Sequence, residues 1–523
     1  MQTKYYFLKN SISVVFGADV PFGRGCFRFF LQFRAAACYC LSYNFIPTGF
    51  FCRSVASEMS ISAKSFIVSL GVLLVSLSAF ALPSAREMCA IMDFDRADID
   101  KITPEVFAEF SKLAKKRDSD AFVGAGVCRY FGIGTQRDVS QAARDFSAAA
   151  FAGNPYGMFA FAVCTSEGDG VVQYQKGAIA LWESSAKKGC LNSLNRLGIC
   201  YYKGIGVPAD PAKAVELFKK AIELNRAKVS LARAYLEGRG VEKNPAEALR
   251  LLELAARDGN VVAQNNLGIF WFEGLGGRSD EFKAFSWFEA AAKKDYPPAI
   301  LFLGMSYLQG AGVPPDPIRG VSLLKKAANL GNTEAQNNLA YCYANGIGVE
   351  QNSVQAFEYY KKAAVGGYAL AQNTLGDCYF SGNGCAEDKA EAVRWYRRAA
   401  FQGDVSAQSN LGYCYLEGIG TGKSAADAIK WLKKAADAGD VSAQSNLGTC
   451  YVNAVGVKQN LPEAVKYLKL AADKEDAQAM GNLGACYYNG LGVERDQFKG
   501  LDLLRRAAKA GNEDAKKALY RLR

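Results

Sequence analysis

Apolar residues recur along most of the chain at the spacing of one helix face. In the segment 405–440, Ala407, Leu411 and Tyr415 follow one another at every fourth position, which places them on one side of a helix. The second half of the segment has the same periodicity, with Ala428, Leu432, Ala435 and Ala436. A glycine turn at 418–420 separates the halves. The segment therefore predicts two short amphipathic helices joined by a tight turn.

The same pattern returns about every 36 residues. One helix position is always glycine or alanine: Gly126, Ala162, Gly198, Ala232, Gly268, Gly304, Ala340, Gly376, Gly412, Gly448 and Gly484. These positions define eleven units from Ser119 to Asn512. Since one helical hairpin cannot bury its own apolar side, the copies must stack. We expect an all-α fold, a right-handed α-solenoid of stacked helix-turn-helix repeats over 119–512, with an N-terminal helical cap over 82–118 and a capping helix over 513–523.

The turn inside several units ends in Asp or Asn followed by Pro. Examples are Asp210-Pro211, Asn244-Pro245 and Asp316-Pro317. An Asp or Asn side chain accepts hydrogen bonds from the first free amides of a helix, and Pro suits the first helical position. These pairs predict where the second helix of each unit begins.

These residues resemble the Sel-one-like repeat, a relative of the tetratricopeptide repeat. One unit matches the family pattern at Ala371, Leu375, Gly376, Tyr379, Gly382, Gly384, Ala392, Trp395, Tyr396, Ala399, Ala400 and Gly403. Arg129 and Thr165 replace the tyrosine in the first two units, and Ala454 replaces a turn glycine. The resemblance implies a scaffold or adaptor protein, often bacterial, whose concave face binds proteins or peptides.

Residues 59–81 have the layout of a secretory signal peptide. Lys64 precedes an apolar run, and Ala79-Phe80-Ala81 forms a cleavage motif. We therefore expect an exported protein, periplasmic or secreted, with no stable membrane span in the mature chain; the alternative is a membrane anchor over 65–81. Residues 1–58 are aromatic-rich and aperiodic, and we interpret them as a doubtful upstream extension from a misassigned start.

Composition narrows the chemistry. The 523 residues carry a net charge of +11 and no histidine, which removes every His-dependent triad and His metal site. The charge is too dilute for nucleic-acid binding. Glycine loops such as "GIGVPAD" follow a helix and recur in most units, so we interpret them as turns rather than phosphate sites. Basic pairs late in the second helices, such as Lys433-Lys434, are interpreted as a solvated face. No cofactor, metal or catalytic group is expected.

Eight cysteines share one place in the first helix: Cys128, Cys164, Cys200, Cys342, Cys378, Cys414, Cys450 and Cys486. Stacked helices lie about 8–10 Å apart, whereas a disulfide needs Cα atoms within about 7 Å. Neighbouring members should therefore stay unpaired and act as small buried hydrophobes. Cys89, Cys190 and Cys385 stand outside this ladder, and the disulfide pairing stays unknown.

Two functions remain open. The first is a non-catalytic scaffold that binds proteins or peptides. The second is an enzyme, since some cysteine-rich relatives bind penicillin or hydrolyse β-lactams. Those relatives pair cysteines seven or eight residues apart within each repeat, a spacing that only Cys378 and Cys385 approach. The scaffold is the favoured interpretation.

A polar stripe on the first helix is the candidate binding surface. Counted from its first core alanine, positions four, seven and eleven share one side. The candidate residues are Asn266, Asn338, Asn410, Asn446 and Asn482 at position four, Tyr341 and Tyr413 at position seven, and Asn345 and Glu417 at position eleven. An asparagine side chain both donates and accepts, so it can bind a peptide backbone of any sequence. The alternative is that these asparagines bond the adjacent repeat.

Overall fold

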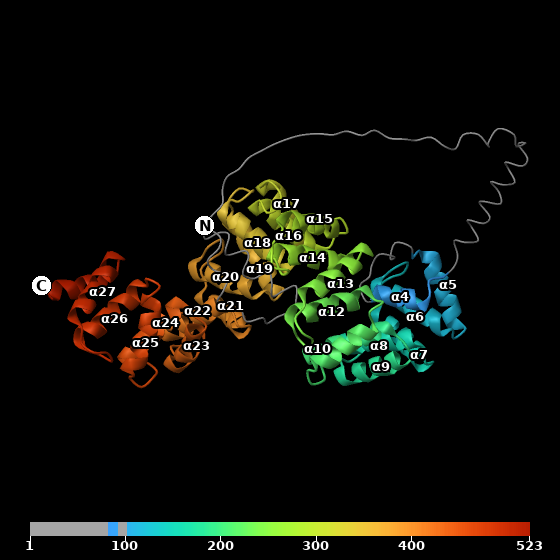
Figure 1. Cartoon of the computed structure of the whole chain (residues 1–523), viewed down its shortest axis with the longest axis horizontal. Helices are drawn as coiled ribbons and strands as arrows, with labels where there is room; N and C mark the ends of the chain where they lie inside the picture. The colour runs from blue at the N-terminus through green and yellow to red at the C-terminus, as the bar shows by residue number, and fades with distance from the viewer. Residues whose placement is uncertain (1–81, 93–101, 523) are drawn as a thin grey trace, which may run out of the picture. The chain divides into compact units, whose positions relative to one another are not determined.

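The computed structural model describes residues 82–92 and 102–522 (Figure 1). In these residues it has 25 helices and no strand, which confirms the all-α prediction. The chain divides into two compact units, one ending at Ala263 and one beginning at Gln264, so the boundary falls inside α14 (Val261–Glu273). The proposed upstream extension and signal peptide lie outside the described residues.

Each repeat is a pair of antiparallel helices, called A and B here. The A helices are α6 (Ser119–Phe131), α8 (Pro155–Glu167), α10 (Leu191–Lys203), α12 (Asn225–Glu237), α14, α16 (Pro297–Gln309), α18 (Thr333–Asn345), α20 (Ala369–Ser381), α22 (Val405–Glu417), α24 (Val441–Asn453) and α26 (Ala477–Asn489). The B helices are α7 (Val139–Phe151), α9 (Gln175–Lys187), α11 (Pro211–Lys220), α13 (Pro245–Arg257), α15 (Glu281–Ala292), α17 (Pro317–Asn329), α19 (Ser353–Val365), α21 (Lys389–Phe401), α23 (Ala425–Asp437), α25 (Leu461–Ala472) and α27 (Gln497–Lys509). Three further helices flank them: α4 (Ala85–Met92), α5 (Pro104–Lys115) and α28 (Glu513–Arg521).

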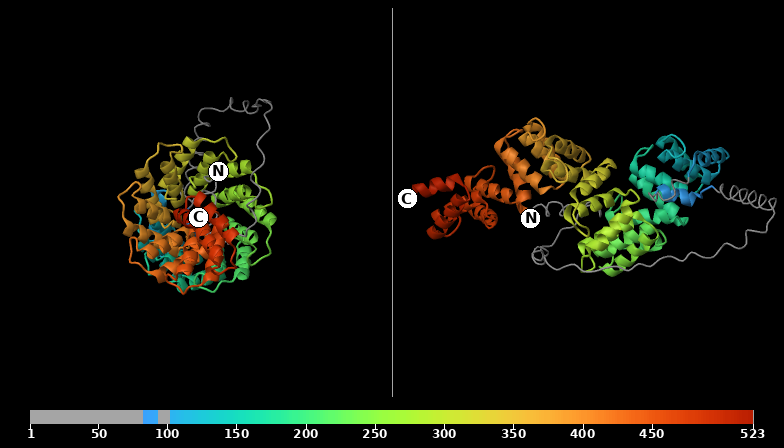
Figure 2. Two further views of the ribbon diagram at one scale, coloured as in Figure 1. Left: turned by 90° about the vertical axis from the view of Figure 1, so that its left-hand side faces the viewer. Right: turned by 90° about the horizontal axis from the view of Figure 1, so that it is seen from above.

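Within each unit, the B helices pack against the A helix of their own repeat and the A helix of the next. Helix α21, for example, contacts both α20 and α22, and successive A helices such as α22 and α24 also touch. Within each unit, consecutive helix pairs lie side by side in chain order in Figure 1 and in the right-hand view of Figure 2. The leucines between them, such as Leu411 and Leu432, are fully buried. The stacking of otherwise unstable hairpins is thus the source of the core.

A small residue inside helix A permits this close packing. A Cβ atom on Gly412 would lie 2.7 Å from Cγ of Leu432 in helix B of the same repeat. Glycine in a helix costs about 1 kcal/mol relative to alanine, so a steric requirement explains its recurrence. The same crowding is found at Gly448 against Leu468.

The turn between helices A and B needs two glycines for different reasons. Gly418 ends α22 in the left-handed conformation, with φ of 75°, and its amide donates to the carbonyl of Cys414 at 2.8 Å. Gly420 lies against the preceding repeat, where a Cβ atom would overlap the carbonyl oxygen of Lys389. Helix B then starts at a capping residue, as Asp210 shows by accepting from the amide of Lys213 at 3.0 Å. Ala454 adopts the left-handed conformation without being glycine, with φ of 57°.

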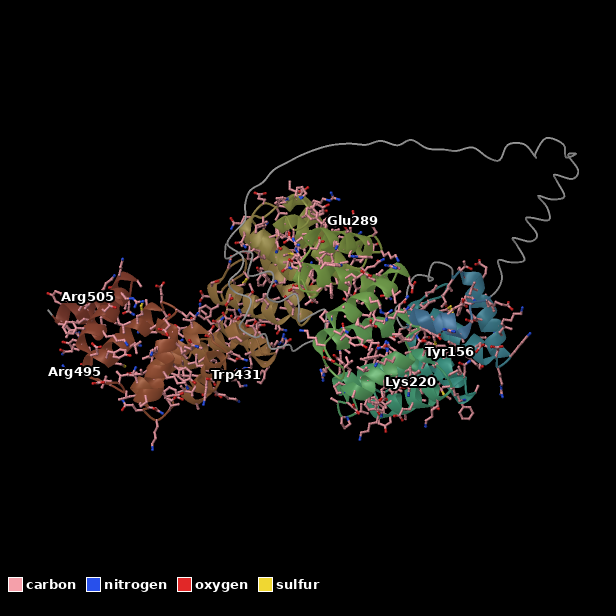
Figure 3. All side chains as sticks on the ribbon, viewed as in Figure 1. Tyr156, Lys220, Glu289, Trp431, Arg495 and Arg505 are labelled. Carbon is pink, nitrogen blue, oxygen red and sulfur yellow. The ribbon has the colours of Figure 1, made fainter. Side chains whose placement is uncertain are left out.

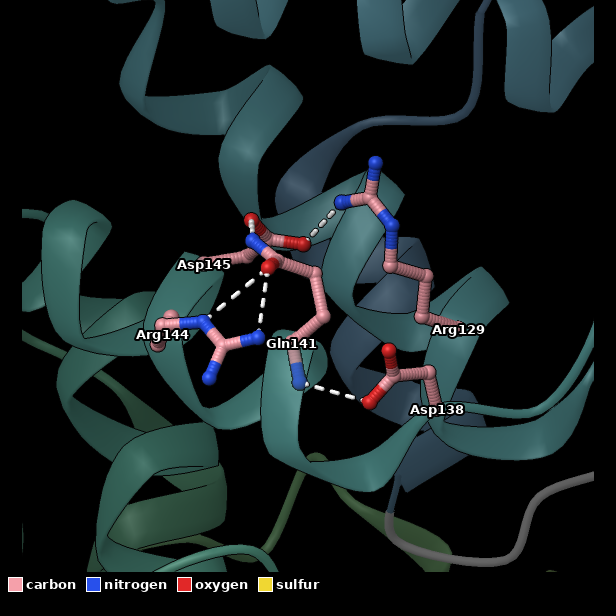
Figure 4. A network of polar contacts seen from close by, with 5 residues as sticks. All are labelled: Arg129, Asp138, Gln141, Arg144 and Asp145. Carbon is pink, nitrogen blue, oxygen red and sulfur yellow. Dashed lines mark hydrogen bonds and ion pairs between the residues drawn. The ribbon is translucent and has the colours of Figure 1, made fainter.

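The first repeat replaces the family tyrosine with a buried ion pair (Figure 4). Arg129 of α6 pairs with the buried carboxylate of Asp145 in α7. Gln141 Nε2 also donates to Asp145 at 3.1 Å. Burial raises the pKa of Asp145, and these two partners oppose the rise. The pair therefore compensates for a carboxylate that would otherwise be costly to bury.

In the part of the chain that the structure describes, every helix is too short or too polar to cross a bilayer.

Candidate functional site

The candidate stripe on the A helices is divided between buried and exposed side chains. Asn266 and Asn338 are buried, with 4% and 5% of their surface exposed. Asn410, Asn446, Asn482 and Tyr341 are half-buried, whereas Tyr413, Asn345 and Glu417 are exposed. Position four therefore lies at the edge of the contact between A helices, and positions seven and eleven reach solvent.

The amide nitrogens of the position-four asparagines donate to the preceding repeat wherever a hydrogen bond from them is found. Asn410 Nδ2 donates to Asn373 Oδ1 at 3.1 Å and to Asp377 Oδ1 at 3.3 Å. Asn482 Nδ2 donates to Thr449 Oγ1 at 2.8 Å. Asn338 Nδ2 lies 3.6 Å from the sulfur of Met305. These contacts are the kind that the alternative interpretation expects, in which the asparagines form hydrogen bonds with the adjacent repeat.

Asp377, at position seven of the eighth repeat, is the centre of a polar cluster. Its carboxylate accepts from the hydroxyl of Tyr396 at 2.8 Å as well as from Asn410. Although Asp377 is partly exposed to solvent, desolvation of its carboxylate raises the pKa of Asp377 to about 6. The hydrogen bond from Tyr396 lowers this pKa, and the charge of Asp404 raises it further. The stripe thus contains a carboxyl group that changes charge just below neutral pH.

In the first two repeats the stripe is apolar, and α4 covers it together with α5, whose Phe110 would overlap a Cβ atom on Gly124. Positions four and seven are Gly124 and Val127 in α6, and Ala160 and Val163 in α8. Helix α4 packs against both α6 and α8. Its buried residues join the same apolar cluster as these valines: Ala85, Met88, Cys89 and Ile91.

Cys89 also fixes α4 by a polar contact, because its thiol donates to the carbonyl of Tyr156 at 3.3 Å. Sequence reasoning placed a helical cap over 82–118 but did not assign α4 to this surface. The one partial signal was the apolar character of positions four and seven in these two repeats, a pattern that Phe302 and Met305 of the sixth repeat share.

The cysteine ladder is buried throughout, as expected for small hydrophobic side chains. Burial raises the thiol pKa to about 12 at Cys128, Cys164, Cys342 and Cys378, and to about 11 at Cys414 and Cys450. A thiol with so high a pKa is a poor nucleophile. Cys89 and Cys190 are also buried, whereas Cys385 is half-buried and its thiol lies 3.6 Å from the carbonyl oxygen of Cys378.

The repeats match a known family along most of the chain. The Sel1 repeat is found at 119–150, 155–190, 191–225, 226–260, 261–296, 297–332, 333–368, 369–404, 405–440, 441–476 and 477–512. The protein is therefore a member of the Sel1 repeat family, which confirms the resemblance that the sequence indicated.

Solved structures of the same class are similar to this chain. A protective antigen of uropathogenic Escherichia coli strains, described as having an SLR fold, is 30% identical over 79% of this chain and 89% of its own, with a TM-score of 0.49. A Sel1 repeat protein from Oxalobacter formigenes is also 30% identical, over 59% of this chain and 90% of its own, with a TM-score of 0.43.

Proposed function

We propose that the protein is a non-catalytic scaffold that binds a protein or peptide partner along the A helices of repeats seven to eleven. One observation carries this proposal: five successive A helices present hydrogen-bonding side chains at positions seven or eleven that remain open to solvent. Tyr413 is 42% exposed, and Asn345 and Glu417 are exposed as well. Such a row offers an extended chain repeated donors and acceptors. Membership of the Sel1 repeat family supports the same role.

We place the proposed partner contact mainly at positions seven and eleven, because position four is largely occupied within the stack. Asn266 and Asn338 are too buried to reach a partner without movement of the A helices. Asn410 and Asn482 already use their amide nitrogens within the stack. Asn482 Oδ1 also accepts from Gln478 Nε2 at 3.5 Å. The side-chain carbonyl oxygen of Asn410 and the exposed Tyr413 and Glu417 are therefore the groups that we assign to partner contact.

A peptide-display selection tests this assignment. The full chain is used to select from a random peptide library, and the selected peptides are then measured against two variants. Tyr341→Ala, Tyr413→Ala and Glu417→Ala together should weaken binding at least about tenfold, because tyrosines are frequent binding hot spots. The matched control changes exposed residues of the B helices, Glu358→Ala, Lys361→Ala and Lys433→Ala, and should bind as the wild type does. Equal binding by both variants would rule out the A-helix surface.

We also propose that the chain is exported, on the basis of the signal-like segment 59–81. N-terminal sequencing of the natural protein should give Leu82 as the first residue. A retained segment 65–81 would instead indicate a membrane anchor, and a retained Met1 would refute cleavage altogether.

Hydrolysis of β-lactams remains the second candidate, although no observation in the described residues specifically favours it. A chromogenic cephalosporin assay on the purified chain should show no turnover above a heat-inactivated control. Turnover that is lost on replacing Cys385 or Cys378 would reverse the order of the two candidates.

A further inference from the structure

Charge is segregated between the two helix layers of repeats six to eleven. The six A helices of these repeats, α16 to α26, contain no Lys or Arg and three acidic residues. The six B helices, α17 to α27, contain 18 Lys and Arg and six acidic residues. The A helices α10 and α12 of the third and fourth repeats do carry cations, such as Arg196 and Lys228. Segregation is therefore a property of this part of the chain rather than of the repeat itself.

The cations concentrate on the outermost line of the B helices. At 100° per residue, positions two, six, nine and thirteen of helix B lie within one narrow arc, which we call the outer ridge. Position nine is a cation in all six repeats, and all are exposed: Lys325, Lys361, Arg397, Lys433, Lys469 and Arg505. In the first five repeats the same position holds Ser147, Glu183, Lys219, Glu253 and Glu289. Glu289 and Arg505 are labelled in Figure 3.

Few carboxylates of the protein neutralise the cations of the outer ridge. The outer ridge of repeats six to eleven carries ten cations and four carboxylates in total. In the described part of the chain no ion pair involves the position-nine cations, although Arg394 pairs with Glu391 at 2.9 Å and Lys466 with Glu463 at 2.7 Å. The neighbouring position ten is held in place by aromatic rings, since Arg398 and Lys434 lie 4.4 and 4.5 Å from the ring centres of Trp395 and Trp431.

Large apolar side chains project from both ends of the same ridge. At position two they are Ile318, Val354 and Phe498, which are 74%, 56% and 91% exposed. At position thirteen they are Val365 and Phe401, which are 72% and 73% exposed. Exposed apolar groups gathered on one surface are characteristic of an interaction site. The ridge therefore combines a central row of cations with apolar groups that flank it.

We propose that the outer ridge of repeats six to eleven docks on the surface of an anionic phospholipid bilayer. Cations near such a surface are attracted by its negative potential, and apolar side chains beside them enter the boundary between headgroups and acyl chains. An extended acidic peptide would complement the central cations but would leave the flanking Phe401 and Phe498 in water. The docked layer is the B helices, so this contact is independent of the partner surface proposed on the A helices.

Vesicle flotation tests the proposal with the full chain. The vesicles are phosphatidylcholine alone or phosphatidylcholine with about 30% phosphatidylglycerol, which gives a negative surface potential. The variant Lys361→Glu, Arg397→Glu, Lys433→Glu places at position nine the residue that repeats two, four and five already carry. Because each cation near the surface contributes roughly a fivefold change in partition, binding to the anionic vesicles should fall by at least about a hundredfold. Wild-type binding should also weaken as salt is added.

The matched control reverses three cations elsewhere, Lys176→Glu, Lys187→Glu and Lys219→Glu, and should bind nearly as the wild type does. All these chains share the apolar segment 59–81, so differences between them report the ridge alone. A second variant with glutamine at the three ridge positions covers the case in which the reversal impairs folding, which thermal melting detects. The Phe401→Ser, Phe498→Ser variant should lose the binding that remains at high salt.

Three results would overturn the proposal. The first is equal binding of the wild type to both kinds of vesicle. The second is unchanged binding by the triple ridge variants. The third is retention of the chain by polyglutamate or duplex DNA, sensitive to the ridge variants, with no binding to the anionic vesicles.

Discussion

At the scale of single residues, the turn glycines separate steric from conformational requirements. Gly420→Ala introduces both an overlap with Lys389 and a left-handed alanine, so it should be the most destabilising change. Gly439→Ala has the positive φ of 96° but open space around it, and should cost about 1–2 kcal/mol. Gly422→Ala has neither constraint and should be neutral or stabilising by up to about 1 kcal/mol. Urea unfolding of the three variants gives the order, and a Gly420→Ala effect no larger than that of Gly439→Ala would contradict the close approach.

Asparagines at position four should contribute differently to the free energy of unfolding, although their positions in the repeat are equivalent. Asn410→Ala removes the donor to Asn373 and Asp377 and should destabilise the chain by about 1–3 kcal/mol. Asn446→Ala is the matched control from the next repeat, because the described structure gives its side chain no hydrogen bond. Equal unfolding free energies for the two variants would count against the role of Asn410 in joining repeats.

Asp377 predicts a pH dependence whose sign follows from its raised pKa of about 6. The folded state holds the proton more tightly than the unfolded state, whose carboxyl titrates near 3.9. The contribution of Asp377 to stability is therefore largest at low pH and declines as pH rises through the window from about 4 to 6. The difference in unfolding free energy between the wild type and Asp377→Asn should shift against the wild type across this window. A difference that stays constant would mean that the carboxyl is not desolvated.

At the scale of helices, α4 should stabilise the first two repeats alone. Met88 is fully buried, so Met88→Ala should cost about 2–5 kcal/mol in the local stability of α6 and α8. Arg86→Ala on the exposed side of α4 is the control, since its ion pair with Glu223 is 3.7 Å long and open to solvent. Hydrogen exchange should speed up in α6 and α8 for Met88→Ala and stay unchanged in α24 to α27. Uniform acceleration along the chain would contradict this local role.

Individual helices were predictable because their signals are local. The spacing of Ala407 and Leu411 and the turn at Gly418 are sufficient to define helix A. The extent to which each asparagine of the stripe is buried could not be predicted from its residue type. Asn338 lies next to Met305, whereas Asn410 lies next to Asn373 and Asp377. The docking of α4 was not predictable either, since its few apolar residues do not specify which helices they contact. The sequence of one repeat therefore does not specify which residues of other helices its side chains contact.

At the scale of the whole molecule, the cysteine ladder offers a repeat-by-repeat record of unfolding. Each repeat contacts only its neighbours, so the last repeats should open before interior ones. Cys486 near the C-terminus should thus be alkylated before Cys450, and Cys450 before Cys414. Mass spectrometry after timed alkylation in mild urea gives the order, with the half-buried Cys385 as the fast reference. Simultaneous labelling would indicate a single cooperative unit.

The close contact of Gly420 with the carbonyl group of Lys389 also limits how such a chain can change its length over evolution. Inserting or deleting part of a unit would move the glycine away from that carbonyl and disrupt the contact between repeats. Duplication of a complete unit preserves every contact of this kind. The eight residues VSAQSNLG occur identically at 405–412 and 441–448, as expected if one of these repeats arose as a copy of the other. The solenoid can therefore lengthen or shorten during evolution in steps of one repeat, and each step adds or removes a complete pair of helices.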